Sequence, residues 1–571
     1  MSTPDDAVAV FRDIESELTG SNGPFAVVDA VVGGETMRVY RDTPASFDDV
    51  FTSLVNEHPD EVLLVEDGAA YTYRQVGDQA GVIAASLARR VGVRDGDRVG
   101  IAMKNRVEFI VALVAIGRCG GVAVLFNSRE AEVEIAAAVS DAECVAILAD
   151  GPRAARIRAR DRSTPIVVVD DDRIDEPVYR YADLAAGRDS TASRPAPEAD
   201  APSWILFTSG TSGRSKGVVL THRNVCTLVV SLRLFTETGV VTNARKYGME
   251  PDAIRGLMPR LSALLVFPLF HTSGLVALMT TMFTGGVVVI MPRWDVRLAI
   301  DLIEQHRLAM LAGPPMVIVD VLNEASPVER IGSLINVAAA GQTTPPDLVA
   351  KLSRVLPAAG RGVGWGMTET TASVSTAGGD VLAAHPDTSG SASPVMEVRA
   401  VDASGHVVSG SGVVGELQVR GPQVMAGYLN RPEETAAVFD GSWYRTGDLG
   451  YVDDRGLIYV VDRVKDIVIT GGENVYCAEV EYVLLASEQF TEVAVFGAID
   501  ERLGERVVAA VTVVDGVELS ADDVRDIVRA SLAAYKAPAD VVFGFGPLPR
   551  NATGKVLKRA LRDRYAASDE T

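Results

Sequence analysis

The chain has 571 residues, of which 47% are hydrophobic and 23% are charged, and its formal net charge at pH 7 is -22. This length exceeds a single ordinary hydrophobic core, so we expect two or more globular domains. The strongly negative charge repels polyanions and argues against a nucleic acid or an anionic membrane surface as partner.

Strands and helices alternate in the first two thirds of the chain. The apolar runs predict strands at 99–103, 122–126 and 145–148, and the helical patterns between them predict helices at 108–116 and 132–139. This βαβ alternation predicts a parallel sheet covered by helices on both faces. A segment at 190–202, rich in Ala, Pro and Ser, then reads as a linker or surface loop.

Residues 208–217 read TSGTSGRSKG and follow an apolar strand predicted at 204–207. Apart from Arg214 and Lys216, every residue in this segment is Gly, Ser or Thr. Glycines let the backbone approach a ligand closely, hydroxyls add donors and the two cations supply counter-charge, so the segment predicts a polyphosphate cradle. It is not a Walker A loop, because Gly217 follows the lysine where a metal-binding Ser or Thr would stand. A flexible linker is the alternative, which the preceding strand and the capped helix expected from Thr221 make less favourable.

One stretch without charged residues, 261–292, is long enough to span a bilayer. Pro268, Gly274 and the pair Gly285-Gly286 divide it into shorter strand, turn and helix pieces. We therefore predict no transmembrane segment here, and instead a buried core that also lines an apolar pocket.

The pattern of predicted elements changes in the last third of the chain. From about 390, short β runs between glycine turns predict a small β subdomain, with strands at 395–401, 416–420 and 456–461. A composition break at 462–466 precedes a compact α+β unit with strands at 467–470, 493–496 and 507–514, helices at 479–485 and 521–533, and glycine turns at 471–474 and 548–555. We predict two domains, 1–464 and 465–571.

The four cysteines are scattered without paired spacing, so neither a zinc site nor a disulfide framework is expected. The N-terminal residues are acidic and contain no apolar run, which predicts no secretory signal and a cytoplasmic location.

Five further motifs complete a pattern with the cradle. They read Pro-Leu-Phe-His at 268–271, Trp-Gly-Met-Thr-Glu at 365–369, Tyr-Arg-Thr-Gly-Asp at 444–448, Asp-Arg-Val-Lys-Asp at 462–466 with Gly-Gly-Glu-Asn-Val at 471–475, and Pro-Arg-Asn-Ala-Thr-Gly-Lys at 549–555. Each motif is weak alone. In this order they closely resemble the adenylate-forming superfamily of acyl-CoA synthetases, peptide-synthetase adenylation domains and firefly luciferase, and most of all a bacterial fatty-acid or aryl-acid CoA ligase. The resemblance extends from about Tyr71 to Lys558.

The resemblance implies an AMP-forming acyl-CoA ligase that uses ATP, Mg²⁺ and CoA. A carboxylate oxygen is a poor leaving group, so attack on the α-phosphorus of ATP first gives an acyl-adenylate and pyrophosphate, and the CoA thiol then displaces AMP. Such a site acts mainly by positioning and electrostatics. The implied fold is α/β, with a large N-terminal domain of parallel α/β subdomains and a small β subdomain, followed by a mobile α+β C-terminal domain.

Most of the site residues that the resemblance implies would bind ATP. Those for the β and γ phosphates are Thr208, Ser209, Gly210, Thr211, Ser212, Gly213 and Lys216. Trp365, where the family usually has Tyr, would stack on adenine beside Gly366, Gly341 and Gln342. Asp448 would accept hydrogen bonds from the ribose hydroxyls, and Arg463 would contact ribose or phosphate.

The remaining implied residues serve the chemistry itself. Thr368 would touch the α-phosphate, and Glu369 would bind Mg²⁺, a hard cation that prefers carboxylate and phosphate oxygens. Lys555 would bridge the ribose and the carboxylate or α-phosphate. For the second half-reaction, Lys465 would be the hinge, and Gly471, Gly472 and Glu473 would line the pantetheine tunnel.

The acyl pocket is less determined. His271 resembles the family's aromatic gate between acid and CoA, although a core histidine is the alternative. Gly274, Ala340 and Gly341 would complete the pocket. No acidic residue occurs in 261–292, which favours a neutral, apolar fatty, cyclic or aryl acid.

The sequence departs from the family pattern at Ser215, at Gln342-Thr343 and at Cys477, where the family usually has Pro, Ala-Pro and Pro. Other hypotheses are an adenylating enzyme that passes the acyl group to a carrier protein or an amine, a luciferase-like oxidase, and a non-catalytic nucleotide-binding protein. Lys465 and the two tunnel glycines favour CoA as acceptor. Many relatives are dimers, so a homodimer is one option besides the monomer.

Overall fold

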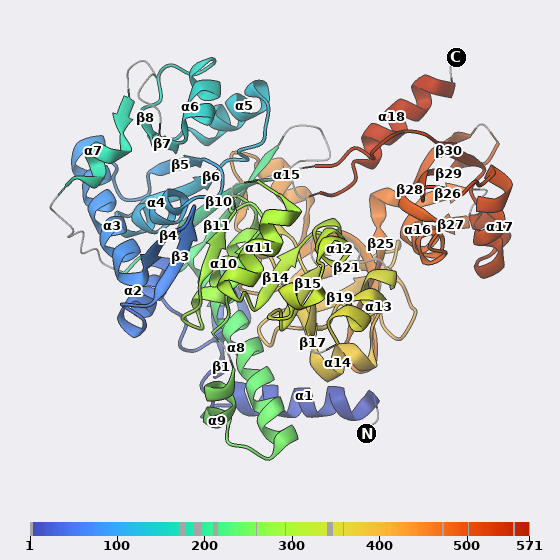
Figure 1. The fold of residues 1–571 in the computed structure, drawn as a ribbon, viewed down its shortest axis with the longest axis horizontal. Helices are drawn as coiled ribbons and strands as arrows, with labels where there is room; N and C mark the ends of the chain where they lie inside the picture. Colours follow the sequence, from blue (N-terminus) through green and yellow to red (C-terminus); the bar gives the residue numbers. More distant parts are fainter. Residues whose placement is uncertain are drawn as a thin grey trace.

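The computed structural model describes residues 4–569 apart from 171–177, 188–195, 209–214, 340–345, 471–472, 552–553 and the single positions 259, 292, 358 and 501. Within these ranges the strands form five sheets, two of them large (Figure 1).

The first large sheet has the strand order β22-β11-β10-β6-β5-β7-β8-β9. Its members are β5 (Arg98–Ala102), β6 (Val122–Leu125), β7 (Ala146–Ala149), β8 (Ile166–Val168), β9 (Val178–Arg180), β10 (Pro202–Thr208), β11 (Lys216–Thr221) and β22 (Gly427–Tyr428). From β10 to β9 neighbouring strands are parallel, whereas β11 and β22 are antiparallel to their neighbours. The parallel sheet predicted from the βαβ alternation is therefore confirmed.

The strand β11 corrects one detail of the sequence analysis. We expected the cradle to lead into a helix, but β11 stands between them and pairs antiparallel with β10, Thr208 opposite Lys216. The cradle thus connects the two strands of a hairpin. The helix begins only after β11, where the Thr221 side chain accepts from the Asn224 backbone N–H and caps it.

The second large sheet has the order β18-β17-β16-β15-β14-β12-β13-β3-β4. Its members are β3 (Val62–Glu66), β4 (Ala69–Thr72), β12 (Ala263–Leu265), β13 (Val288–Ile290), β14 (Met310–Gly313), β15 (Asn336–Ala339), β16 (Gly360–Trp365), β17 (Ser375–Gly378) and β18 (Ser391–Ala392). Strands from β3 to β16 are parallel, and the flanking strands β4, β17 and β18 are antiparallel.

Helices lie between the two large sheets and on both outer faces. Those that share one core with the inner faces are α2 (Phe47–Glu57), α3 (Tyr73–Ser86), α4 (Val107–Arg118), α8 (His222–Tyr247) and α10 (Thr272–Met282). Those on the outer faces are α5 (Glu132–Ala142) and α6 (Gly151–Arg158) on the first sheet, and α11 (Val296–His306), α12 (Pro315–Glu324) and α13 (Pro346–Val355) on the second. Residues 107 and 109–116 of α4 are all buried, as expected for a helix enclosed between two sheets.

The charge-free stretch 261–292 folds as predicted, because β12, a turn, α10 and β13 divide it and most of its side chains are buried. In the part of the chain that the structure describes, one helix, α8, is long and apolar enough to cross a membrane, and 56% of its apolar window is buried inside the protein. A buried core helix passes the same test.

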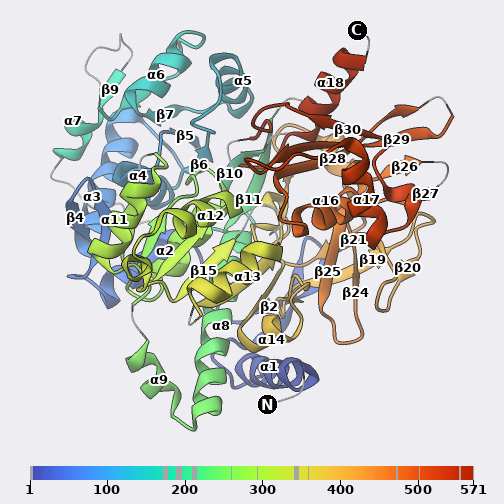
Figure 2. The ribbon, with the colours of Figure 1, turned by 45° about the vertical axis from the view of Figure 1, so that its right-hand side comes forward.

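The N-terminal residues form a unit that the sequence analysis did not anticipate. Helix α1 (Pro4–Thr19) precedes a hairpin of β1 (Val27–Val32) and β2 (Glu35–Tyr40). In Figures 1 and 2, α1 lies across α8 and beside α14 (Gly379–Ala384). Three further short helices are α7 (Tyr181–Ala185), α9 (Pro251–Leu257) and α15 (Pro432–Ala437).

The last third forms a small antiparallel sheet and a separate lobe. The sheet contains β19 (Glu397–Val401), β20 (Val407–Val408), β21 (Gly415–Arg420), β23 (Phe439–Asp440), β24 (Trp443–Val452) and β25 (Ile458–Arg463). The lobe contains β26 (Val468–Thr470), β27 (Glu473–Val475), β28 (Phe490–Asp500), β29 (Gly504–Val513), β30 (Asp540–Phe543), α16 (Cys477–Ala486), α17 (Ala521–Ser531) and α18 (Lys558–Asp569). It lies at the right of Figure 1 and comes forward in Figure 2. The predicted fold class is thus confirmed.

Two details of the lobe concern the predicted glycine turns. The turn predicted at 471–474 is wrong in its second half, because Glu473 and Asn474 belong to β27 and pair with β26. The turn at 548–555 is confirmed by hydrogen bonds that its ends make: the backbone N–H of Asn551 donates to the carbonyl of Lys555, 2.8 Å, and that of Gly554 to the carbonyl of Asn551, 2.9 Å.

Candidate functional site

Asp448 is the centre of the candidate site. It lies in β24, opposite Arg463 of β25, and only 3% of it is exposed. The indole N–H of Trp365, at the end of β16, donates to its Oδ2 at 2.8 Å. Arg463 Nε lies 2.9 Å from its Oδ1, but Oδ1 accepts no well-aligned hydrogen bond from the described residues. A buried carboxylate oxygen of this kind can accept a hydrogen bond from a ligand hydroxyl.

Glu369 lies next to this centre, in the 3-10 helix Thr368–Thr370 that follows β16. The hydroxyl of Tyr428 in β22 donates to its Oε1 at 3.0 Å. Burial raises the pKa of Glu369, and the hydrogen bonds to the carboxylate together with the charges of Arg463 and Lys216 oppose that shift. An Mg²⁺ ion would stabilise the ionised form further, so the donor set fits a single hard cation held partly by phosphate oxygens.

Gly366 lets the backbone pass close to the residues behind Glu369. A Cβ atom at this position would lie 2.1 Å from the carbonyl oxygen of Ala372, so a larger residue would push the two segments apart. Thr368 itself is 9% exposed. Glycine is thus required here for the close approach of two backbones.

Lys216 stands at the cradle's far end, as the first residue of β11. Its ammonium forms an ion pair with Glu434 of α15 and lies 5.0 Å from the ring centre of Tyr428. The same tyrosine therefore contacts Glu369 with its hydroxyl and Lys216 with its ring. At the other end of the cradle, the hydroxyl of Thr208 donates to the carbonyl of Lys216 across a long 3.5 Å contact.

Lys555 reaches the same region from the C-terminal lobe. Burial first, and then the positive charges of Arg463 and Lys465, lower the pKa of Lys555 to about 8, while Asp448 and Asp466 act in the opposite direction. The lysine at the end of the predicted basic turn therefore lies within the electrostatic field of the Asp448 centre. Lys465 lies in the 3-10 helix Val464–Asp466, directly after β25, where the chain passes into the lobe.

The loop that carries His271 is fixed by a residue far away in the chain. Asn105, which follows β5, donates from Nδ2 to the carbonyl of Phe267 at 2.9 Å and accepts from the backbone N–H of Leu269 at 2.8 Å. Gly274 lies against the same loop, because a Cβ there would be 2.2 Å from the carbonyl oxygen of Pro268. Burial and the charge of Arg129 lower the pKa of His271 to about 4, so the imidazole is neutral at physiological pH.

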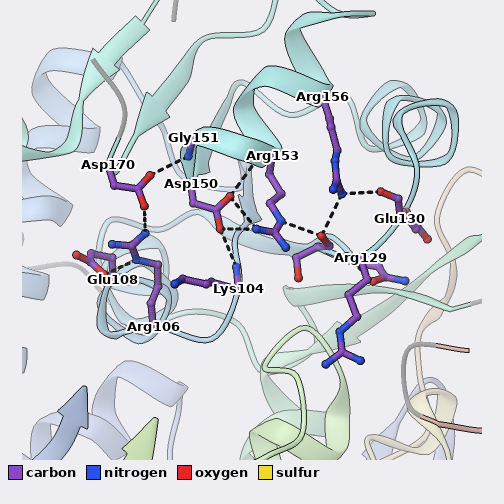
Figure 3. Close-up of polar contacts among 12 residues, drawn as sticks. Lys104, Arg106, Glu108, Arg129, Glu130, Asp150, Gly151, Arg153, Arg156 and Asp170 are labelled. Carbon is purple, nitrogen blue, oxygen red and sulfur yellow. Dashed lines mark hydrogen bonds and ion pairs between the residues drawn. The ribbon is translucent and has the colours of Figure 1, made fainter. Parts of the chain in front are cut away.

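Arg129 belongs to a loop that follows β6 at the carboxyl edge of the first sheet (Figure 3). Arg153 and Arg156 of α6 hold this loop, since both donate to the carbonyl of Ser128, at 2.8 and 3.5 Å. Asp150, 1% exposed, accepts from Arg153 in turn. Figure 3 shows Arg129 extending away from this network, and its charge acts on His271.

Several predicted site residues lie outside the described residues, namely Ser209, Gly210, Thr211, Ser212, Gly213, Ala340, Gly341, Gln342, Gly471 and Gly472. Their roles stay predictions. Glu473 lies in β27 and is exposed.

Four residues of the site region were missed by the sequence analysis. Tyr428 and Glu434 contact Glu369 and Lys216, and Asn105 and Arg129 act on the His271 loop. Tyr428 stands in a Gly-Tyr pair that could have been noticed as an aromatic residue beside glycine. The other three carry no local signal.

Comparisons with known proteins identify the family and several relatives of this chain. The family model described as AMP-binding enzyme matches residues 51–429, and the one described as AMP-binding enzyme C-terminal domain matches residues 479–555. A 2-succinylbenzoate–CoA ligase from Bacillus cereus is 29% identical over 506 residues, 88% of this chain and 96% of that protein. The long-chain-fatty-acid–CoA ligase FadD13 from Mycobacterium tuberculosis is 32% identical over 516 residues, 87% of this chain and 93% of that protein.

Solved structures of CoA synthetases are also similar to this chain. The o-succinylbenzoate CoA synthetase from Bacillus subtilis, solved with its acyl-adenylate intermediate and with ATP and a magnesium ion, matches with a TM-score of 0.74 and 27% identity in both cases. The match covers 90% of this chain and 97% or 99% of the two solved chains.

Proposed function

Because this chain belongs to the AMP-binding enzyme family, we propose that it activates an apolar fatty, cyclic or aryl carboxylic acid. It is an AMP-forming acid–thiol ligase that uses ATP, Mg²⁺ and CoA. The first half-reaction joins the acid to AMP and releases pyrophosphate. The second transfers the acyl group to the CoA thiol and releases AMP.

The observation that carries the residue assignments is the meeting of four segments at Asp448. Trp365 and Arg463 contact its two carboxylate oxygens, and Lys555 lies within its field. We assign the ribose hydroxyls to Asp448, whose Oδ1 accepts no well-aligned hydrogen bond from the described residues. Trp365 then borders the adenine, and Arg463 contacts ribose or phosphate.

The assignments for the first half-reaction follow from charge. Carboxylate attack on the α-phosphorus adds negative charge to an already anionic centre, so cations held in place beforehand lower the barrier. We therefore assign to Lys555 the stabilisation of the α-phosphate and the incoming carboxylate, and to Lys216 that of the β and γ phosphates that leave as pyrophosphate. Glu369 would hold Mg²⁺, which when bound neutralises charge on the phosphate oxygens.

An apolar acyl group is supported by the described part of the pocket region. In α10, Leu275, Leu278 and Met279 are buried, and His271 is neutral at physiological pH. A neutral imidazole beside apolar side chains favours an uncharged acyl group over an amino acid, whose ammonium would need a carboxylate partner. Among the described residues, Arg129 places a positive charge near His271 that could accept a second carboxylate, so the acids tested should include an aromatic dicarboxylic acid.

Several finer assignments are proposals of the same kind. We propose that Lys465 is the hinge, that the domains divide at 464 and 465, and that Gly471, Gly472 and Glu473 line the pantetheine tunnel. A cytoplasmic location, a role in fatty-acid metabolism and a homodimeric assembly also remain proposals. Cell fractionation and light scattering test the first and the last.

The experiment that tests the proposed function supplies ATP, Mg²⁺ and CoA with fatty, cyclic, aryl and dicarboxylic acids, and detects thioesters by mass together with AMP. We expect AMP and a thioester with at least one apolar acid, and no product in the Asp448→Ala variant. Pyrophosphate exchange without any thioester would instead indicate a carrier protein or an amine as acceptor. ATP binding without pyrophosphate release would contradict an enzymatic role.

A further inference from the structure

The backbone adopts an unfavourable conformation two residues after Glu369. Thr371 and Ala372, the two residues that follow the 3-10 helix, have φ angles of +53° and +81°. Residues with a side chain rarely adopt this left-handed region, and two in succession cost conformational free energy that the surroundings must offset. Both also close the turn, since the Thr371 N–H donates to the Thr368 carbonyl and the Ala372 N–H to the Met367 carbonyl, each at 3.0 Å.

One residue holds this turn from both sides, through its side chain and through its backbone. Gln423, in the segment between β21 and β22, is fully buried with 0% exposure. Its side-chain Nε2 donates to the carbonyl of Ser373 at 2.8 Å, and its backbone carbonyl accepts from the hydroxyl of Thr371 at 2.6 Å. These bonds bracket Ala372. Two residues further on, the backbone N–H of Met425 donates to the carbonyl of Glu369 at 2.8 Å, so residues 423–425 run along the whole turn.

The orientation of the Gln423 amide is itself fixed. Its Oε1 accepts from the hydroxyl of Ser231 in α8 at 3.0 Å. That hydroxyl also lies 3.2 Å from the hydroxyl of Tyr40, and both lie close to the hydroxyl of Ser393, at 3.1 and 3.0 Å. With its oxygen engaged by Ser231, the amide must present its nitrogen to Ser373.

Tyr40 connects this network to the N-terminal hairpin. It is the last residue of β2 and is 2% exposed. The hairpin precedes residue 51, where the match to the family model begins. A hydroxyl from this N-terminal unit thus reaches, through Ser231 and Gln423, the turn that carries Thr368 and Glu369.

We propose that Gln423 is a positioning residue for Thr368 and Glu369, and that Tyr40 assists it by orienting the Gln423 amide. The proposal rests on the proposed function of those two residues. Gln423 holds the backbone of the strained turn, so that the Glu369 carboxylate and the Thr368 hydroxyl keep their places in the first half-reaction. Neither Gln423 nor Tyr40 touches a substrate.

The first test compares Gln423→Leu with Gln418→Leu. Gln418 is also a buried glutamine, 3% exposed, but its amide oxygen accepts from Arg399 in the small sheet. We expect Gln423→Leu to lower kcat for pyrophosphate release about tenfold or more and to raise the Mg²⁺ concentration needed for half-maximal activity. Gln418→Leu should change neither quantity, even where it lowers the melting temperature as much as Gln423→Leu does. Equal effects of the two variants on both readouts would overturn the proposal.

A second variant separates positioning from folding. In Gln423→Glu the side chain keeps its shape, but it can donate to the Ser373 carbonyl only when the carboxyl is protonated. We expect its activity relative to the wild type to rise as the pH falls from 8 to 6. A wild-type pH profile in this variant would contradict the assignment. Tyr40→Phe should lower kcat by a smaller factor, because Ser231 and Ser393 still contact each other.

A third readout does not depend on activity. Hydrogen exchange of residues 366–376 should become faster in Gln423→Leu and stay unchanged in Gln418→Leu. Unchanged protection would overturn the proposal whatever the substrate turns out to be. If the wild type itself forms no adenylate while this exchange result holds, the proposed function fails and the positioning role of Gln423 stands.

Discussion

We expect the activity to depend on pH through Lys555, the lysine near Asp448. Burial disfavours the ammonium form of Lys555 and lowers its pKa to about 8, so the side chain is charged below that pH and neutral above it. Since the first half-reaction needs this positive charge, kcat/KM for ATP should fall as the pH rises above about 8. Pyrophosphate exchange measured between pH 6 and 10 checks this. In Lys555→Arg, which remains charged, the alkaline decline should move to higher pH, and an unmoved decline would assign it to another group.

At the same scale, we expect Glu434 to compete with ATP for Lys216. The two side chains form an ion pair that nucleotide phosphates must replace. A partly exposed pair of this kind is worth at most ~1 kcal/mol, so Glu434→Gln should lower KM for ATP by about twofold to fivefold. Glu433→Gln, at the neighbouring exposed position, is the matched control and should leave KM unchanged. A higher KM in Glu434→Gln would show that Glu434 contributes to binding instead.

The complementary change removes the cation. Lys216→Ala should slow pyrophosphate release by about 100-fold or more, as expected for loss of a preorganised charge. Thioester formation from supplied acyl-adenylate should be largely unaffected, because the pyrophosphate has already left. A comparable loss in both half-reactions, measured separately, would argue against a role confined to the β and γ phosphates.

At the scale of elements, the loop between β12 and α10 depends on Asn105. Asn105→Ala would leave the buried carbonyl of Phe267 and the N–H of Leu269 without their partner, at a cost of about 1–3 kcal/mol each. We expect a lower melting temperature and a KM for the acid that rises more than the KM for ATP. Asn105→Asp keeps the acceptor for Leu269 but loses the donor to Phe267, so its effect should be intermediate. Equal changes in the two KM values would place the loop away from the acid.

At the scale of the whole molecule, the C-terminal lobe follows Lys465. In the present arrangement Lys555 lies near Asp448, and Asp462, before the hinge, accepts from the N–H of Ala478 in α16 at 3.1 Å. On the proposal that the lobe moves about Lys465 before the thioester step, Lys465→Pro, which fixes φ, should reduce thioester formation far more than adenylation. Separate single-turnover assays of the two steps measure this, with Lys465→Ala as the variant that keeps the backbone free. Equal losses in both steps would contradict a hinge at this position.

The sequence by itself determined the fold class and the βαβ order, and it showed the motifs at 365–369, 444–448 and 549–555, because each depends on a short run of residues whose chemistry is local. The phosphate cradle at 208–217 stays a prediction. Patterns of glycine, hydroxyl and apolar residues depend only on neighbours in the chain, so they can be recognised without the tertiary structure. The strand β11 was missed because Val218-Val219-Leu220 gives no local sign of pairing with β10, which is decided across the hairpin.

Only the tertiary structure decided which distant residues form hydrogen bonds with one another. Trp365 and Asp448 are 83 positions apart, and Gln423 and Ser231 are 192 apart, yet each pair shares a hydrogen bond. Such pairs form because burying a polar group is costly unless a partner is placed beside it, and the packing of distant strands and helices supplies that partner. The same reason explains why Glu434, Asn105 and Tyr40 had no signal in the sequence. Their roles depend on the residues that they contact in the folded protein, and those residues are distant in the chain.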